Sequence, residues 1–278
     1  MNPIRIGVVS RSFPALTHAE IARTLEAAGA ASTELCLSSA DTTYWVYNGR
    51  SDLHSLTDRK FAGIVSEYRA HGIDIPAFGV FTNLIDPNED ERKKNLDYYE
   101  RHMALAGAQG IPFVSTECGF SPHERGVNAD RYEEDFDRLK RSLTDLCQRA
   151  AYHSVYIALE TCVIDIVPSA KRADDLIRQV GSDRLRILLD PANLIANSSE
   201  RDMFAYLAPH IAYFHGKDRK VNDAYGRAVG DGDIDWPLFL SLYHRHCEGK
   251  PFILEYVGLD NFREIMDRVR TYDAQARA

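Results

Sequence analysis

The chain has 278 residues, of which 45% are hydrophobic and 27% charged, as in an ordinary soluble protein with a sizeable core. Its net charge of −8 and its pI near 5.7 argue against a general nucleic-acid surface and against an anionic-membrane surface. No stretch approaches the roughly 20 apolar residues that span a bilayer, and the first residues lack a signal-peptide core. We therefore expect a soluble, cytoplasmic protein.

The cysteines are too far apart to form a zinc-thiolate site, because no two of them make a CxxC pair. Their odd number favours reduced thiols, which suits a cytoplasmic protein. The five are Cys36, Cys118, Cys147, Cys162 and Cys247.

Short β-branched runs alternate with amphipathic helical stretches along the whole chain. Strands are predicted at residues 4–9, 33–37, 73–81, 112–117, 155–160, 185–190, 211–215 and 252–255. Helices are predicted between them at residues 17–28, 58–71, 89–107, 132–152, 169–180, 201–208, 236–247 and 262–276.

Eight strands alternating with eight helices predict a parallel sheet with crossover helices. This count favours closure into a (β/α)8 TIM barrel that fills residues 1–278 as one domain, since such barrels take about 250 residues. A doubly wound open sheet is the alternative.

Four of the later predicted strands end in a residue type that binds metals: YIALE, RILLD, AYFH and FILE. In a parallel barrel the C-terminal strand ends meet at one mouth, so these side chains are expected to meet in space. Three converging carboxylates repel one another unless protons or a cation compensate them, and one divalent ion does so. We name this predicted metal-binding set the ligand cluster: Glu160, Asp190, His215 and Glu255.

Taken singly, each of these residues has a simpler interpretation. A lone acid at a strand end is usually its first solvated residue, and a lone histidine there is more often a hydrogen-bonded interior residue. The ordered set on consecutive strands favours a metal site instead. Oxygen-rich ligands with one imidazole suit Mn²⁺ first, with Mg²⁺, Co²⁺ or Zn²⁺ as alternatives.

The ordered motifs resemble those of the xylose isomerase-like barrel superfamily, in its sugar phosphate isomerase/epimerase branch. The likeness is carried by ALET around Glu160, LLDPAN around Asp190, FHGKD around His215, ILEYVG around Glu255, and VGDGDIDW at 229–236. The resemblance implies metal ligands in the order Glu, Asp, His, Glu on strands five to eight.

Four further residues are predicted to bind the substrate. Ketose 3-epimerases that this chain resembles commonly carry a histidine where Asn193 stands, and an asparagine can bind a hydroxyl but cannot shuttle a proton. The resemblance implies that Lys217 faces the pocket and stabilises an enediolate oxygen; a surface salt bridge with Asp218 is the alternative. Glu117, at the end of the fourth predicted strand, is expected to touch the substrate or to orient a ligand.

The fourth substrate-binding residue is Trp45, in the loop sequence TYWVY. This loop is interpreted either as an apolar lid over the barrel mouth or as packing against the barrel. Glu34 resembles a recurrent family position, with a buried polar contact as the alternative. His123 lies in a loop after the fourth strand and is expected to be exposed rather than in the pocket.

The sequence GDGDIDW is not a phosphate loop, because its acids would repel phosphate and no GK[ST] follows. We interpret it as a turn with helix-capping acids, which favours a non-phosphorylated substrate. Those acids are Asp231, Asp233 and Asp235.

The resemblance and the ligand cluster together predict a metal-dependent isomerase or epimerase of a small sugar or polyol-derived ketone, acting through an enediolate. Glu160 and Glu255 are the predicted acid/base pair. A dehydratase of an inosose or dehydroshikimate type is the main alternative. A metal-dependent endonuclease, which needs extra ligands and a basic surface, and a non-catalytic ligand-binding barrel are less favoured. The expected partner is a carbohydrate-like small molecule, without nucleic acid or membrane, and a homo-oligomer is compatible with the sequence.

Overall fold

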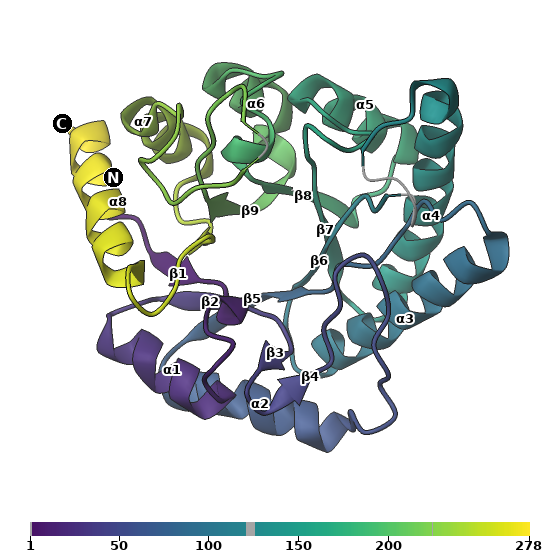
Figure 1. Cartoon of the computed structure of the whole chain (residues 1–278), viewed down its shortest axis with the longest axis horizontal. Helices are drawn as coiled ribbons and strands as arrows, with labels where there is room; N and C mark the ends of the chain where they lie inside the picture. Colours follow the sequence, from purple (N-terminus) through teal and green to yellow (C-terminus); the bar gives the residue numbers. More distant parts are fainter. Residues whose placement is uncertain (1, 121–125, 224) are drawn as a thin grey trace.

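Parallel strands surround a central axis and an outer ring of helices covers them (Figure 1). The computed structural model describes residues 2–120, 126–223 and 225–278, and in these ranges eight parallel strands close into a barrel in the order β1-β10-β9-β8-β7-β6-β5-β2. The predicted (β/α)8 barrel is confirmed. Its strands are β1 (Ile6–Val8), β2 (Ser32–Leu35), β5 (Asp74–Gly79), β6 (Phe113–Glu117), β7 (Tyr156–Glu160), β8 (Leu185–Leu189), β9 (Ile211–Gly216) and β10 (Phe252–Leu254).

The helices begin and end close to the residues predicted from periodicity. Thr17 and Glu20 form a capping box at the first helix, where each side chain accepts a backbone N–H of the other residue. The helices are α1 (His18–Ala27), α2 (Asp58–Ala70), α3 (Glu89–Ala108), α4 (Tyr132–Tyr152), α5 (Ala170–Val180), α6 (Glu200–Leu207), α7 (Trp236–Cys247) and α8 (Phe262–Arg277).

Two short features that periodicity did not predict lie at the C-terminal ends of the strands. An antiparallel hairpin of β3 (Ser38–Ser39) and β4 (Thr42–Thr43) follows β2. Short 3-10 turns follow β1 and β8, at Ser10–Ser12 and Pro191–Asn193. Both turns place polar side chains near the barrel mouth. His123 falls outside the described residues.

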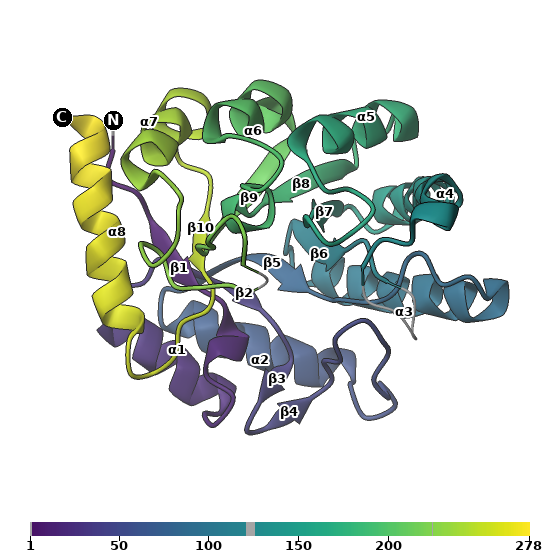
Figure 2. The same ribbon diagram turned by 45° about the horizontal axis from the view of Figure 1, so that its top comes forward.

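The last helix closes the ring beside the start of the chain, as Figure 2 shows. The backbone N–H of Ile4 donates to Asp273 Oδ2 at 3.3 Å, which ties the segment before β1 to α8. Because β1 pairs with both β10 and β2, this contact joins the first and last parts of the barrel.

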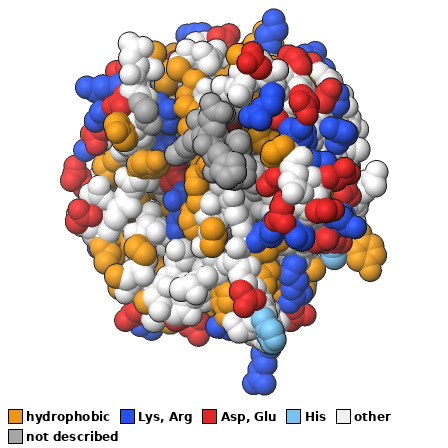
Figure 3. All heavy atoms as spheres, turned by 45° about the vertical axis from the view of Figure 1, so that its right-hand side comes forward, with side chains coloured by type: hydrophobic (Ala, Val, Ile, Leu, Met, Phe, Trp, Pro, Cys, Tyr) orange, Lys and Arg blue, Asp and Glu red, His pale blue; other side chains and the backbone are white. Residues whose placement is uncertain are grey.

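Acidic and basic side chains are intermixed over the face drawn in Figure 3. One ion-pair network joins α3 to α4, where Arg149 lies within 2.9 Å of carboxylate oxygens of Asp97, Glu100 and Asp145. Pairs of this kind are partly exposed, so each contributes at most about 1 kcal/mol. Within the described ranges, no helix combines the length and apolar character needed to cross a membrane.

Candidate active site

The four residues of the ligand cluster lie together at the C-terminal ends of neighbouring strands. Glu160 is the last residue of β7, His215 lies in β9, and Asp190 and Glu255 directly follow β8 and β10. All four are at most 3% exposed. One ligand atom from each lies within 4.8 Å of the others. The structure thus brings together the residues that the sequence predicted to meet.

A layer of apolar side chains supports the cluster from inside the barrel. Side chains alternate along a strand, so the residue two positions before each cluster residue points to the same side. These supporting residues are all fully buried or nearly so, and they belong to one apolar group. They are Ala158, Leu188, Tyr213 and Ile253. The ligand cluster therefore packs on a layer of buried apolar side chains in the barrel interior.

The ammonium group of Lys217 lies among the carboxylates of the cluster. Its Nζ is 2.5 Å from Asp190 Oδ2, 2.9 Å from Glu255 Oε2 and 3.9 Å from Glu160 Oε1. Burial would lower the pKa of Lys217, but the carboxylates of Asp190 and Glu160 raise it. The amine is therefore charged, and it compensates carboxylates that would otherwise repel one another.

The cluster fits a divalent metal ion. Asp190 Oδ2 is buried and has no hydrogen bond of acceptable geometry within the described part of the chain, although Lys217 lies close to it. Three carboxylates and one imidazole form a donor set that hard and borderline divalent ions accept. The charge of Lys217 compensates Asp190 Oδ2, but the lone pairs of this oxygen accept no hydrogen bond within the described ranges. They are therefore free to coordinate a metal ion.

His215 is held between two carboxylates. Its Nε2 lies 2.6 Å from Glu34 Oε2, while Nδ1 faces Glu160 Oε1 at 3.4 Å and Glu255 Oε2 at 3.8 Å. Burial alone would lower the pKa of His215, but Glu34 and Glu160 raise it to about 10. The ring therefore presents Nδ1 to the cluster, with Nε2 fixed by Glu34.

Two acids of the ligand cluster, Glu160 and Asp190, differ in their proton affinity. Burial would raise the pKa of Glu160, but the charges of His215 and Lys217 lower it to about 2. Burial raises the pKa of Asp190, against the opposing effect of Lys217. Glu160 is therefore ionised over the whole physiological pH range.

Asn193 lies in the turn after β8 and contacts the cluster directly. Its Nδ2 donates to Glu160 Oε1 at 2.8 Å, and its Oδ1 accepts from Arg219 at 3.3 Å. Asp190 forms the same turn, since its Oδ1 accepts the backbone N–H of Ala192 at 2.9 Å. Asn193 can thus orient Glu160 as well as contact a ligand.

A cavity of about 180 Å³ opens directly over the cluster. Sites for drug-sized ligands hold about 300–1,000 Å³, so this cavity suits a compact molecule. All four predicted substrate-binding residues line it, although their roles stay predictions. The lining residues are Arg11, Trp45, Tyr47, Phe81, Glu117, Cys162, Asn193, Lys217, Arg219, Glu255 and Tyr256.

The aromatic loop after β2 forms one wall of this cavity. Trp45 packs edge-on against Phe81 at a centroid distance of 5.8 Å, and the Tyr47 hydroxyl donates to Glu117 Oε2 at 2.5 Å. Tyr44 points away and bonds Ser55 at 2.7 Å. Trp45 and Tyr47 therefore line the cavity, whereas Tyr44 packs on the barrel; the lid stays a prediction.

The family model described as xylose isomerase-like TIM barrel matches residues 22–272 of this chain. The chain belongs to this family. The resemblance drawn from the strand-end motifs is thereby confirmed. The search of curated proteins found no significant match to the sequence.

Solved structures share the fold at low sequence identity. The 3-keto-D-glucoside 4-epimerase from E. coli, in its apo form, is 14% identical with a TM-score of 0.73, and 96% of this chain and 99% of that chain are covered. The IOLI protein with a binding zinc atom is 15% identical with a TM-score of 0.73, covering 99% and 96%. A probable 3-DHS dehydratase involved in petrobactin synthesis in Bacillus anthracis is 17% identical with a TM-score of 0.72, covering 96% and 98%. This likeness shows the fold, which sugar epimerases and a dehydratase share.

The surface salt bridge between Lys217 and Asp218, an alternative reading of the sequence, is wrong for this family member. Both residues are buried, at 5% and 0% exposure. Asp218 instead accepts the Trp236 Nε1–H at 2.8 Å and the backbone N–H of Gly230 at 2.9 Å. A Cβ at Gly232 would lie 2.1 Å from Asp218 Oδ1, so only glycine allows this approach. Asp218 therefore anchors the GDGDIDW loop beneath Lys217.

The acids of that loop have structural partners, as the sequence predicted for a turn with a capping residue. Asp235 caps α7 by accepting the backbone N–H of Leu238 at 3.0 Å. Asp231 pairs with Arg268 at 2.7 Å, and Asp233 Oδ2 accepts a backbone N–H at 2.9 Å. The loop positions Lys217 rather than forming a phosphate cradle.

Two arginines of the cavity were not predicted from the sequence. Arg11 lies in the turn after β1, bonds Glu255, and stacks 5.4 Å from the Trp45 ring centroid. Arg219 lies two residues after Lys217 and lines the same cavity. A signal was available for both, because each follows a strand by a few residues, at the end where barrel active sites form.

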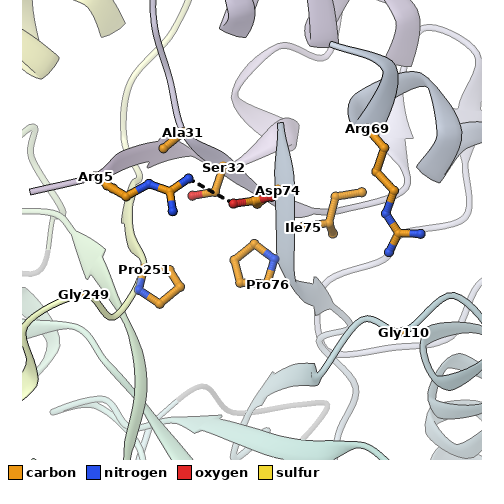
Figure 4. Close-up of a pocket in the computed structure, with 10 residues that line it drawn as sticks. All are labelled: Arg5, Ala31, Ser32, Arg69, Asp74, Ile75, Pro76, Gly110, Gly249 and Pro251. Atoms are coloured by element: carbon orange, nitrogen blue, oxygen red, sulfur yellow. Dashed lines mark hydrogen bonds and ion pairs between the residues drawn. The ribbon is translucent and has the colours of Figure 1, made fainter. Parts of the chain in front are cut away.

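A second cavity, of about 270 Å³, opens at the opposite end of the barrel (Figure 4). Its lining residues precede or begin the strands, and Arg5 pairs there with Asp74 at 3.0 Å in an exposed ion pair. Pro76 and Pro251 complete its wall. Although this cavity is larger, its end of a TIM barrel serves stability, whereas catalytic groups gather at the C-terminal end. The smaller cavity over the ligand cluster is therefore the candidate active site.

Proposed function

We propose that this chain is a divalent-metal-dependent isomerase or epimerase of a small polyhydroxy carbonyl compound. The observation that carries the proposal is the buried ligand cluster at the floor of a compact cavity with aromatic and cationic walls. All four cluster residues would hold the ion, for which we propose Mn²⁺. When bound, the ion would act as a Lewis acid on the substrate's carbonyl and adjacent hydroxyl, acidifying the neighbouring C–H and stabilising an enediolate.

The chain's own residues would move the protons. Glu160 ends β7 and Glu255 follows β10, where Glu255 lines the cavity, and each would use a carboxylate oxygen to take a proton from carbon. Asn193 would fix Glu160 through its bond to Oε1, leaving Oε2 for this task. Lys217 would donate to an enediolate oxygen from the cavity wall. Trp45 and Phe81 would exclude water from the reactive intermediate.

A dehydratase is the second candidate, because the same proton abstraction followed by loss of a β-hydroxyl would use the same residues. The replacement of a second imidazole by Asn193 supports it, since the site then offers fewer groups to return a proton. The compact cavity supports a small-molecule substrate over a nucleic acid for both candidates.

Solvent deuterium uptake tests the proposal. Protein reconstituted with Mn²⁺ would be incubated in D₂O with free ketoses, inososes and hydroxy-keto acids, and followed by NMR. Deuterium at the carbon next to the carbonyl, dependent on metal, is expected for an isomerase or epimerase. An enone product without hydroxyl-retaining isomers would establish the dehydratase instead. Turnover without exchange or elimination would contradict both candidates.

A further inference from the structure

Arg219 is a buried cation that lacks an anionic partner. It is only 6% exposed, and its guanidinium makes one long hydrogen bond, from Nη2 to Asn193 Oδ1 at 3.3 Å. Its Nε is buried and unbonded, and no carboxylate of the described ranges pairs with it. Arg11, a partly exposed arginine that lines the same cavity, bonds Glu255 instead. Arg219 therefore differs from Arg11 in having no carboxylate partner within the described ranges.

An unpaired buried guanidinium is costly, because it has lost water without gaining a counter-charge. The cavity that Arg219 lines is the place from which an anion can reach it. A guanidinium presents a planar set of N–H groups that matches the two oxygens of a carboxylate, which it can bind in bidentate fashion. Arg219 thus has the geometry of a receptor for a carboxylate on a ligand.

The charge of the cavity walls strengthens this argument. Lys217 and Arg11 are now neutralised by Asp190 and Glu255, which belong to the ligand cluster. A divalent ion held by those carboxylates would compete for the same oxygens, so both cations would turn their charge towards the cavity. Glu117 is engaged by the Tyr47 hydroxyl at 2.5 Å. A neutral sugar would leave three cationic side chains in this cavity against Glu117, the lining carboxylate outside the ligand cluster.

The surroundings favour a singly charged, planar group over a phosphate ester. The cavity holds about 180 Å³, and the acidic loop lies directly behind Arg219, whose backbone carbonyl accepts the Asp233 N–H at 3.0 Å. The carboxylate of Asp218 also lies beside the Arg219 backbone, accepting its N–H at 2.8 Å. These negative charges would repel a dianion more strongly than they would repel a carboxylate, which carries a single charge.

We propose that the substrate is a sugar acid, a polyhydroxy carbonyl compound whose carboxylate binds Arg219 while its carbonyl end lies over the ligand cluster. This inference rests on the proposed function and names the substrate class of that site. The charges of Lys217 and Arg11 add to the electrostatic attraction of the substrate carboxylate, but neither residue forms an ion pair with it. The specificity of the site lies in Arg219.

Binding of a matched, unreactive pair tests the inference. D-gluconate has a terminal carboxylate where D-glucitol has a terminal CH₂OH group, and neither has an aldehyde or ketone to be turned over. Calorimetric titration of Mn²⁺-equilibrated protein is expected to show D-gluconate binding at least about 10-fold more tightly. Arg219→Gln should weaken D-gluconate by about 10- to 100-fold and D-glucitol by less than about threefold. Arg219→Lys keeps the positive charge but loses the planar pair of N–H donors. Its affinity for D-gluconate should lie between those of the wild type and Arg219→Gln.

Lys220→Gln is the matched control, since it removes one positive charge at the next, exposed position. It should leave both affinities within about twofold. If Arg219→Gln does not fold, the salt dependence of binding to the wild-type protein provides the test. Binding of D-gluconate should weaken between about 0.05 and 0.5 M salt, while binding of D-glucitol should not. Equal affinities for the two ligands, or tighter binding of D-glucitol 6-phosphate than of D-gluconate, would overturn the inference.

Different experimental results would contradict the proposed function and this inference. Deuterium exchange on a neutral ketose together with equal binding of D-gluconate and D-glucitol would retain the isomerase and reject the sugar acid. Tight, Arg219-dependent binding of D-gluconate without exchange on any acid or ketone would retain the carboxylate receptor and reject the isomerase.

Discussion

His215 Nε2 and Glu34 Oε2 lie 2.6 Å apart at the floor of the candidate site, although 181 residues separate them in the sequence. Glu34 also accepts hydrogen bonds from Ser115 Oγ at 2.9 Å and from the Tyr213 hydroxyl at 3.0 Å. This carboxylate therefore cannot rotate, and it fixes both the orientation of the imidazole and the nitrogen that carries the proton.

Glu34→Gln should weaken metal binding by about 10- to 100-fold, because an amide no longer supports the Nε2–H of His215 as a carboxylate does. Titration of the purified protein with Mn²⁺, followed by calorimetry, measures this. Tyr213→Phe is the matched control, since it removes another hydrogen bond to Glu34 without touching His215. Its effect on metal affinity should be smaller; an equal loss in both variants would assign the effect to general loosening of the floor.

Lys217→Met should destabilise the metal-free protein by about 3–5 kcal/mol, because it leaves the buried carboxylates of the ligand cluster without their cation. Saturating Mn²⁺ should restore much of this loss, since the ion would compensate the same oxygens. Urea denaturation in EDTA and in Mn²⁺ gives the two free energies of unfolding.

Lys220→Met is the control for that experiment, because Lys220 is exposed and its loss should change stability by less than about 0.5 kcal/mol. Destabilisation of Lys217→Met by the same amount with and without Mn²⁺ would show that the amine stays on the carboxylates in the loaded protein. Lys217 would then be a permanent counter-ion rather than a residue released towards the cavity.

The positions of the ligand cluster could be predicted from the sequence, because each residue ends an apolar run that had to be buried. In a parallel barrel all such ends face the same way, so residues far apart in the sequence, such as Glu160 and Glu255, were expected to meet. The helices α4 and α7 begin and end at the predicted residues, and Asp235 caps α7 with its side chain.

What could not be predicted depends on tertiary contacts with no local signal. The burial of Arg219 follows from how the GDGDIDW loop folds over Asp218, which accepts donors from positions 12 to 18 residues away. Glu34 lies in β2 and His215 in β9, two strands that are not neighbours in the barrel. Their contact across the barrel interior therefore has no local signal in the sequence. The hairpin of β3 and β4 has two residues in each strand, which is too short for a period-two pattern to appear.

His102 makes the stability of the fold depend on pH. Burial lowers the pKa of its imidazole from 6.5 to about 4, and its Nδ1 bonds the Tyr98 carbonyl oxygen at 2.8 Å. Below pH 6.5 the unfolded chain takes up a proton that the folded protein accepts only near pH 4. The free energy of unfolding should therefore fall as the pH decreases through this window, by up to about 3 kcal/mol from this residue.

His102→Leu should flatten the dependence between pH 6.5 and 4, as measured by urea denaturation at several pH values. His54→Leu, at an exposed position, should leave the slope as in the wild type. A wild-type slope in the His102→Leu variant would show that other groups, such as the buried His18, account for the acid sensitivity.

Glu160→Gln and Glu255→Gln distinguish proton transfer from metal binding in the ligand cluster. Gln keeps one acceptor oxygen but cannot act as a base, so two-base chemistry predicts at least about a 10³-fold loss of turnover in each variant. At position 160 the amide oxygen can still accept from Asn193, and the metal should stay bound. At position 255 the amide must turn its NH₂ towards either Arg11 or Lys217, so we expect weaker metal binding there.

Metal occupancy must therefore be measured beside the rate, on folded protein, by elemental analysis after dialysis. Glu117→Gln is the control, because it removes a charge from the same cavity without removing a ligand, and it should bind metal as the wild type does. With two bases, solvent deuterium exchange should survive in at most one of the two Gln variants, the one that retains the abstracting carboxylate. Normal turnover by either variant with metal bound would make that glutamate a ligand only, and a one-base isomerase or a dehydratase would then account better for the site.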